Sequence, residues 1–198
     1  MREGVQAIAD KHIGCADVSP FLESVDYSSE FDSVADFRLT ISTYLIQHCQ
    51  TYIDAETISL TSTEKVRERA LASARGYFAF ATANPHEFAV LSTLNPTTEL
   101  PQSFDADDDR FPKGIAFATL QGLVRQSIIE GGGPESPWTL FEQTISLWAT
   151  AHGLAMMCVN GPLSGLDNTT KFNFMAPVMD TALDGMIQCL GFIEPERA

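Results

Sequence analysis

The sequence predicts an all-α protein, on two observations. Apolar residues recur with the three- and four-residue spacing of amphipathic helices over most of the chain, and prolines and glycines separate these segments. No convincing run of alternating polar and apolar residues indicates a strand. With 198 residues, 44% of them hydrophobic and 19% charged, the chain is expected to fold around one core, as one domain or one domain with a small appendage.

The first clear helix is predicted over about residues 34–53, where a single apolar stripe keeps helical spacing. Thr61 and Glu64 have capping-box spacing and should begin a second helix. That helix must stop at Asn84-Pro85, because proline cannot continue it.

Three further segments follow in the middle of the chain. An N-cap and a first-turn proline at residues 84–85 start a short helix through Leu91. Residues 95–112 hold three prolines and an acidic run, and we expect an exposed loop there rather than a metal site, since the ligand spacing of a calcium loop is absent. A helix over residues 113–129 should end at the glycines of residues 131–134, which read as a connector rather than a phosphate loop.

Two long helices are predicted at the C-terminal end. Ser136 and Pro137 supply an N-cap and a first helical position for a helix that Asn-Gly-Pro at residues 160–162 closes. The last helix is expected over about residues 174–190, with Pro177 tolerated in its first turn.

Both long helices are apolar over a broad surface. A monomer of this size would struggle to cover them, so we expect a homodimer in which the two helices and their symmetry mates form a four-helix bundle. The residues expected at the dimer interface are Leu147, Leu154, Met175, Val178, Met179 and Met186.

Charge and composition exclude several classes of partner. The 12 Lys and Arg residues against 26 Asp and Glu give a formal net charge of −14, which disfavours binding to nucleic acids and anionic membranes. No segment reaches the roughly 18 apolar residues of a membrane span, and no signal peptide is recognisable, so a cytoplasmic protein without a membrane partner is expected. The four scattered cysteines form no CxxC pair and are expected to be buried, reduced thiols.

No pattern of an enzyme is present. The chain has no HExxH motif, no ExxH pair for a helical di-metal site and no GxSxG motif. A Cys-His pair could still assemble only in space. We assign no catalytic residue, no metal and no cofactor, and expect a binding protein.

Two short motifs carry a family resemblance. The first is Trp148-Ala149-Thr150-Ala151-His152-Gly153, which resembles the Trp-x-x-x-His-Gly signature in the C-terminal domain of one branch of TetR-like bacterial transcriptional regulators. The second is Gly76-Tyr77-Phe78-Ala79-Phe80-Ala81 followed by Asn84-Pro85-His86-Glu87-Phe88, which is similar to the same family's helix that ends at an Asn-Pro or His-Pro. The resemblance implies a helical effector-binding and dimerisation domain over residues 35–198, and the function of a ligand-sensing transcriptional regulator.

The same resemblance implies a cavity for a small apolar ligand, enclosed by the helices between residues 34 and 129 and the helix of Trp148. Apolar walls with a few polar groups are typical of such sites. The residues expected to line it are Tyr44, His48, Tyr77, Phe80, Phe88, Phe117, Trp148, His152 and Met156. Each of them is also compatible with an ordinary core position, and in that case the chain would be a structural, protein-binding dimer without an effector.

His152 and Gly153 are open to two interpretations. The imidazole of His152 could hydrogen-bond an effector, or bond a neighbouring backbone carbonyl and only fix the packing of its helix. Gly153 lowers helix propensity, which favours a close approach of two helices at this point.

The N-terminal segment departs from the family. Such regulators begin with a basic helix-turn-helix domain that neutralises phosphates. Residues 1–37 hold two basic and eight acidic residues, two minus eight making the segment net −6. We therefore expect residues 1–34 to be a short acidic segment with a truncated or degenerate helix-turn-helix, so that DNA is a partner only if a helix-turn-helix is present or restored.

Overall fold

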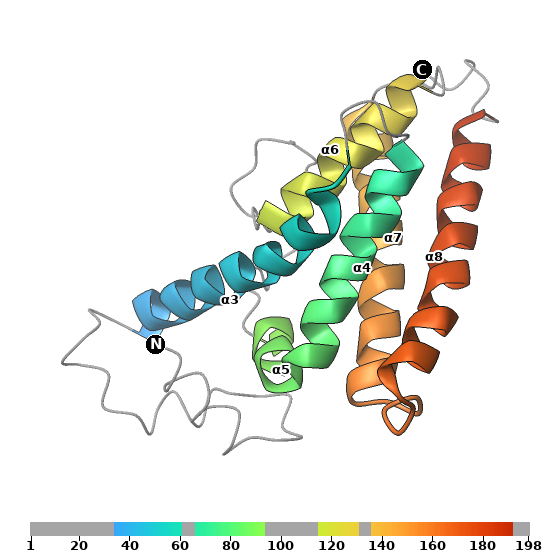
Figure 1. The fold of residues 1–198 in the computed structure, drawn as a ribbon. Coiled ribbons are helices and arrows are strands. Elements are labelled where there is room, and N and C mark those ends of the chain that lie inside the picture. Colours follow the sequence, from blue (N-terminus) through green and yellow to red (C-terminus); the bar gives the residue numbers. More distant parts are fainter. Residues whose placement is uncertain (1–33, 61–65, 94–114, 131–135, 192–198) are drawn as a thin grey trace.

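The protein is all-helical in every part that the structure describes (Figure 1). A computed structural model describes residues 34–60, 66–93, 115–130 and 136–191, and these contain no strand, which confirms the predicted class. The predicted capping pair at Thr61 and Glu64, the acidic loop and the glycine connector lie outside the described residues. The helices are α3 (Val34–Thr57), α4 (Val66–Ala83), α5 (Pro85–Thr93), α6 (Ile115–Glu130), α7 (Pro137–Val159) and α8 (Asn168–Gly191).

Helix α4 is central to the arrangement. It packs most extensively against α3, and it also contacts α5, α6, α7 and α8. Figure 1 shows α4 between α3 on one side and the nearly parallel axes of α7 and α8 on the other. Side chains that leave α4 in different directions therefore meet every other described helix.

A glycine sets the distance between α3 and α4. A Cβ atom added to Gly76 would lie 2.5 Å from the Cα atom of Ile53 and 2.7 Å from the carbonyl oxygen of Tyr52. Both are backbone atoms, which cannot swing aside as a flexible side chain would. Only glycine permits this close approach of the two helices.

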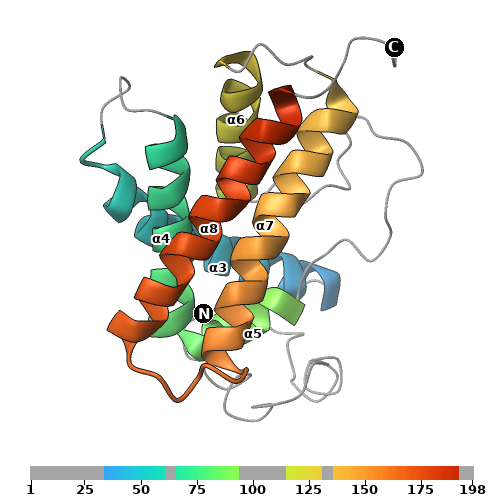
Figure 2. The ribbon, with the colours of Figure 1, turned by 90° about the vertical axis from the view of Figure 1, so that its right-hand side faces the viewer.

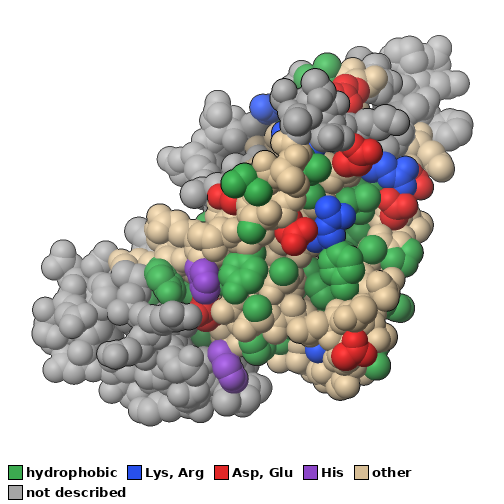
Figure 3. Space-filling view, viewed as in Figure 1, with side chains coloured by type: hydrophobic (Ala, Val, Ile, Leu, Met, Phe, Trp, Pro, Cys, Tyr) green, Lys and Arg blue, Asp and Glu red, His purple; other side chains and the backbone are tan. Residues whose placement is uncertain are grey.

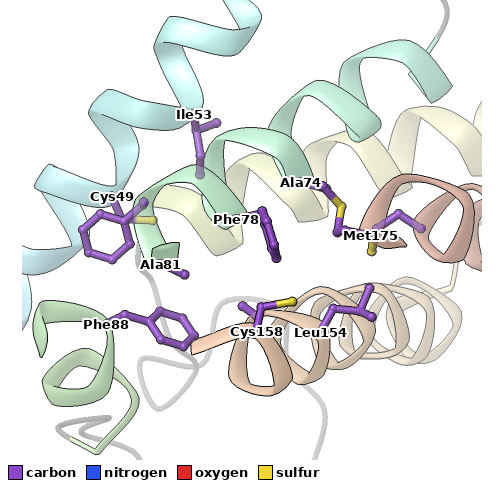
Figure 4. Packing of buried hydrophobic residues seen from close by; sticks show 12 residues of the cluster. Cys49, Ile53, Ala74, Phe78, Ala81, Phe88, Leu154, Cys158 and Met175 are labelled. Carbon is purple, nitrogen blue, oxygen red and sulfur yellow. The ribbon is translucent and has the colours of Figure 1, made fainter. Parts of the chain in front are cut away.

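The core consists of two apolar clusters that α4 joins. In the first, Phe78 and Ala74 of α4 pack among residues of α3, α5, α7 and α8 (Figure 4). In the second, Val66 and Ala70 of α4 pack with residues of α6, α7 and α8. Complete burial of one such large side chain contributes about 1.5–3 kcal/mol.

Cys49 and Cys158 lie in the first cluster as free, buried thiols, as the sequence predicts. Burial raises the pKa of the Cys49 thiol to about 12, so this sulfur stays protonated at neutral pH.

Both ends of α7 lie where the sequence predicts them. The hydroxyl of Ser136 accepts a hydrogen bond from the backbone N–H of Thr139 at 3.0 Å, and Pro137 occupies the first turn. The helix ends at Val159, where Asn160 is the C-cap residue.

Helix α8 begins six residues before the predicted start at residue 174, so the prediction is wrong at this end. The carboxylate of Asp167 explains the difference, because its Oδ1 atom accepts from the N–H of Thr170 at 3.0 Å and its Oδ2 atom accepts from the Thr170 hydroxyl at 2.6 Å. The first residues of α8 are polar and exposed, so apolar periodicity could not reveal them. Pro177 is consequently inside the helix rather than in its first turn.

The boundary between α4 and α5 also differs in detail from the predicted cap. The carbonyl oxygen of Asn84 accepts from the N–H of Phe88 at 2.9 Å, which starts α5. Its side-chain Nδ2 atom donates to the carbonyl of Phe80 at 3.2 Å instead. Asn84 therefore closes α4 with its side chain and opens α5 with its backbone.

Substitution of Gly76 by alanine should destabilise the protein, because the new methyl group must push apart the backbones of α3 and α4. The expected loss is about 1–3 kcal/mol in the free energy of unfolding, measured by urea denaturation. Gly122→Ala on α6 is the matched control, since nothing lies within 4 Å of its added Cβ. That control should gain up to about 1 kcal/mol from helix propensity. Equal stability of the two variants would contradict the packing role of Gly76.

Candidate functional site

Aromatic side chains from α3, α4, α5 and α7 gather around the C-terminal half of α4. Tyr77 and Phe80 lie one turn apart on α4 and carry two groups of ring contacts. Phe80 and Phe88 are completely buried, whereas the histidines of both groups are half-buried. The site therefore combines buried rings with polar groups that keep some access to solvent.

The first group surrounds His48 of α3. Its Nδ1 atom lies 2.6 Å from Oε2 of Glu87 on α5, and the side chains are 23% and 12% exposed. The imidazole packs edge-on against Phe80 and Tyr52, each with a centroid distance of 5.6 Å, and its centroid is 6.1 Å from that of Tyr44. When His48 is neutral, Glu87 keeps its proton on Nδ1, which leaves Nε2 as a hydrogen-bond acceptor.

The second group surrounds His152 of α7. Its Nδ1 atom lies 2.8 Å from the hydroxyl oxygen of Tyr77. The indole of Trp148, one turn earlier on α7, stacks on the imidazole with a centroid distance of 4.9 Å and an interplanar angle of 12°. Phe88 contacts both Tyr77 and His152, with centroid distances of 5.8 and 5.4 Å. This group ties α4, α5 and α7 together.

The Tyr77–His152 pair is uncharged at neutral pH. Burial lowers the pKa of His152, because desolvation penalises the imidazolium ion. Burial also raises the pKa of the Tyr77 phenol, with a smaller contribution from Cys49. The hydrogen bond consequently joins a neutral phenol to a neutral imidazole.

Most of the predicted ligand-site residues are brought together. Two ring groups contain Tyr44, His48, Phe80, Tyr77, Phe88, Trp148 and His152. Met156 packs against the same core cluster that contains Phe80 and Phe88, and the side chain of Phe117 lies outside the described residues.

The sequence reasoning missed Glu87 and Tyr52. Glu87 belongs to the Asn84–Phe88 motif, whose local spacing gives no sign of a pairing with His48, 39 positions earlier. Tyr52 follows His48 by one turn on the same apolar stripe, and that spacing was a usable signal.

The residues predicted for the dimer interface are mostly buried within a single chain. Leu147, Leu154, Met175, Met179 and Met186 are 2–6% exposed within one chain, and Val178 is half-buried. Side chains that are already covered lose little further surface when two chains pair.

Gly153 also differs from the expectation. Nothing lies within 4 Å of a Cβ atom added there, and the residue is exposed on α7. The close helix approach expected at Gly153 is therefore absent among the described residues of one chain.

A groove of about 270 Å³ lies between α4 and α8, on another side of α4 from Tyr77. Its charged lining residues are already paired: Arg75 with Glu56 at 3.2 Å, and Asp180 with Arg67 at 2.7 Å. Figure 3 shows basic and acidic side chains next to each other over this region, around apolar surface. Its lining residues are Leu71, Arg75, Met175, Ala176, Pro177 and Asp180, none of them a predicted ligand contact.

Metal and membrane interactions have no support in the described part of the chain. No group of three or more potential ligand side chains is placed there to hold a metal ion. None of the helices described has a stretch long and apolar enough to cross a bilayer.

Comparison with models of protein families gives a match to the tetracyclin repressor-like C-terminal domain over residues 70–180, which is more than half of the chain. The matched range holds Tyr77, Phe80 and Phe88 as well as Trp148 and His152. No curated protein and no solved structure matches the chain.

The buried imidazole of His152 should make stability depend on pH. Its pKa in the folded state lies below the ordinary value of 6.5, so below that pH the unfolded chain takes up a proton that the folded chain does not. Urea denaturation at pH 7.5 and 5.5 should therefore show a smaller loss of stability in His152→Gln than in the wild type. His86→Gln on α5 is the control and should keep the wild-type difference. Identical pH dependence in all three proteins would contradict this account.

Proposed function

The chain belongs to the tetracyclin repressor-like C-terminal domain family, and on this premise we propose that it is the ligand-sensing, dimerising body of a transcriptional regulator of the Trp-x-x-x-His-Gly branch. The family consists of regulators rather than enzymes. We place the body at residues 35–198. The observation that carries the proposal is that the matched range contains the whole ring group of Tyr77, Phe88, Trp148 and His152, together with Phe80 and Glu87, the partners of His48 in the other group.

The chemistry of the ring groups supports a ligand site. Rings from four helices supply apolar surface, while His48, Glu87, Tyr77 and His152 supply hydrogen-bonding groups at two separate places. Small-molecule sites in proteins combine these features. A ligand that inserts between the rings would contact α3, α4, α5 and α7 at once.

Two glycines inside long helices support a homodimer. Gly153 of α7 and Gly185 of α8 are exposed, and no atom of the described residues lies within 4 Å of a Cβ added to either one. A glycine in a helix interior costs about 1 kcal/mol relative to alanine, and no contact within the chain accounts for that cost here. A second copy that approaches α7 and α8 closely would account for it. Gly122 of α6 is equally open but lies outside the two helices of the proposed bundle.

Exposed apolar side chains lie on the same faces. Met157, one turn after Gly153, is 38% exposed, and Phe174, three turns before Gly185, is 44% exposed. Figure 2 shows α7 and α8 side by side, with no described helix in front of them. We propose that these outer faces pair with their symmetry mates in a four-helix bundle.

DNA enters this proposal only through a helix-turn-helix. Residues 1–33 lie outside the described residues, and the net charge of −14 does not favour contact between this body and phosphates. Binding to DNA accordingly requires a helix-turn-helix, present or restored, ahead of α3.

A ligand screen by thermal shift tests the sensing function. Small neutral and charged aromatic molecules should include binders that raise the melting temperature, because a ligand that binds only the native state stabilises it. Trp148→Leu should weaken such binding about tenfold by removing the stacked indole. Trp138→Leu is the control, since that indole is 57% exposed at the start of α7. Equal effects of the two substitutions, or no stabilising molecule of any kind, would count against the function.

Light scattering after size exclusion tests the dimer. The wild type should have twice the mass of one chain at micromolar concentration, and Gly153→Arg should have the mass of one chain. The arginine has open space within its own chain, so the helical circular dichroism should persist. Gly122→Arg on the exposed side of α6 should remain dimeric. A wild-type protein that is monomeric at this concentration would refute the dimer.

A further inference from the structure

The hydroxyl of Ser73 on α4 is buried and has no hydrogen-bond partner among the described residues. Ser73 as a whole is 8% exposed. Buried polar groups are almost always hydrogen-bonded in native proteins, so an unpaired one needs an explanation. The hydroxyl of Ser73 can therefore form a hydrogen bond for which the described residues supply no partner.

Other hydroxyls in these helices behave differently. Those of Thr82, Ser127 and Thr144 each donate to the carbonyl oxygen four residues earlier, at 3.0, 3.0 and 2.6 Å. A helical serine can always reach that carbonyl by rotating its side chain. The hydroxyl of Ser73 does not make this bond, which leaves both its proton and its lone pairs available.

The position of Ser73 connects it to the candidate ligand site. Tyr77 follows it by four residues and Phe80 by seven, so the three side chains leave α4 on the same face. Ala70, three residues before Ser73, packs in the cluster with α6 and α7, whereas Ala74 and Phe78 pack in the cluster with α3 and α8. Ser73 thus lies between the two apolar clusters, one helical turn before Tyr77 along α4.

The polar groups of the site that follow Ser73 are neutral, whereas the guanidinium of Arg69, one turn before Ser73, donates to Oε1 of Gln126 at 2.9 Å. Ser73 carries a hydroxyl, and the hydrogen bond between Tyr77 and His152 joins uncharged groups. The carboxylate of the site, that of Glu87, is paired with His48 in the other ring group. An unpaired charge is very costly to bury, so the uncharged pair of Tyr77 and His152 favours a neutral ligand beside it.

We propose that Ser73 is the polar anchor of the ligand site, and that the ligand is a neutral, mainly aromatic molecule whose carbonyl or ether oxygen accepts a hydrogen bond from the Ser73 hydroxyl. This inference rests on the proposed sensing function and names the chemical class that the site takes. Among the described residues, one other buried side-chain oxygen has no partner, Oε1 of Gln50. The Nε2 atom of that side chain donates to Asp54 at 2.7 Å on the exposed side of α3. It is not assigned to the ligand.

Four probes with one ring system test the class. They are 2-acetonaphthone, which has a carbonyl acceptor, 2-isopropenylnaphthalene, which has the same shape without the acceptor, the 2-naphthoate anion and the trimethyl(2-naphthyl)ammonium cation. Quenching of tryptophan fluorescence gives the dissociation constants. The ketone should bind the wild type about three- to tenfold more tightly than the hydrocarbon, as one hydrogen bond permits, and the two ions should bind least.

Substitution of the serine isolates the hydrogen bond. Ser73→Ala should bind the ketone and the hydrocarbon equally, while Ser127→Ala, whose hydroxyl is bonded within its own helix, should keep the wild-type preference. The melting temperature of ligand-free Ser73→Ala should rise, because the variant no longer buries an unpaired hydroxyl. A lower melting temperature would mean that the hydroxyl serves the fold through a bound water, and would overturn the proposal.

The remaining outcomes separate this proposal from the sensing function. A preference for the ketone that survives in Ser73→Ala overturns the anchor. Tighter binding of either ion than of the ketone overturns the neutral class and leaves the sensing function standing. Binding of none of the four probes also overturns the class, whereas the sensing function fails only if the wider thermal-shift screen finds no stabilising molecule.

Discussion

The close approach of α3 and α4 at Gly76 is the constraint on which the rest of the site depends. Because a Cβ there would meet the backbone of Ile53 at 2.5 Å, the two helices can touch only where a side chain is missing. The side chains that follow Gly76 on α4 then extend beyond the point where the two helices touch. Phe80 meets the rings of His48 and Tyr52, and Tyr77 is free to reach α7. One glycine thus places two aromatic side chains in two different environments.

The short helix α5 links the two environments. Asn84 ends α4 with its side chain and begins α5 with its carbonyl, so the chain reverses within very few residues. Two consecutive residues of α5 then point to different partners, since Glu87 pairs with His48 and Phe88 contacts His152. The ionisable pair and the neutral pair are held at separate ends of the candidate site, so its two ends differ in polarity.

The sequence predicts local features well and the division between core and surface poorly. The limits of α7 followed from Ser136, Pro137 and the residues after Val159, because caps act on their immediate neighbours. The breadth of apolar surface on α7 and α8 was recognised, but periodicity does not say which stripe the chain covers itself. Leu147 and Met179 are consequently core residues, although their pattern suited an interface. The pairing of Glu87 with His48 and the unfilled position at Ser73 depend on contacts far apart in sequence, which one-dimensional spacing does not contain.

Helix α7 shows why these features act together. Its residues Leu147 and Leu154 face the core, Trp148 and His152 face the ring cluster, and Gly153 faces outward. A helix of 23 residues is stiff over this length, so its three faces move as one body. In the proposed function, a ligand that moved α7 away from α4 would therefore also move Gly153 and the outer face.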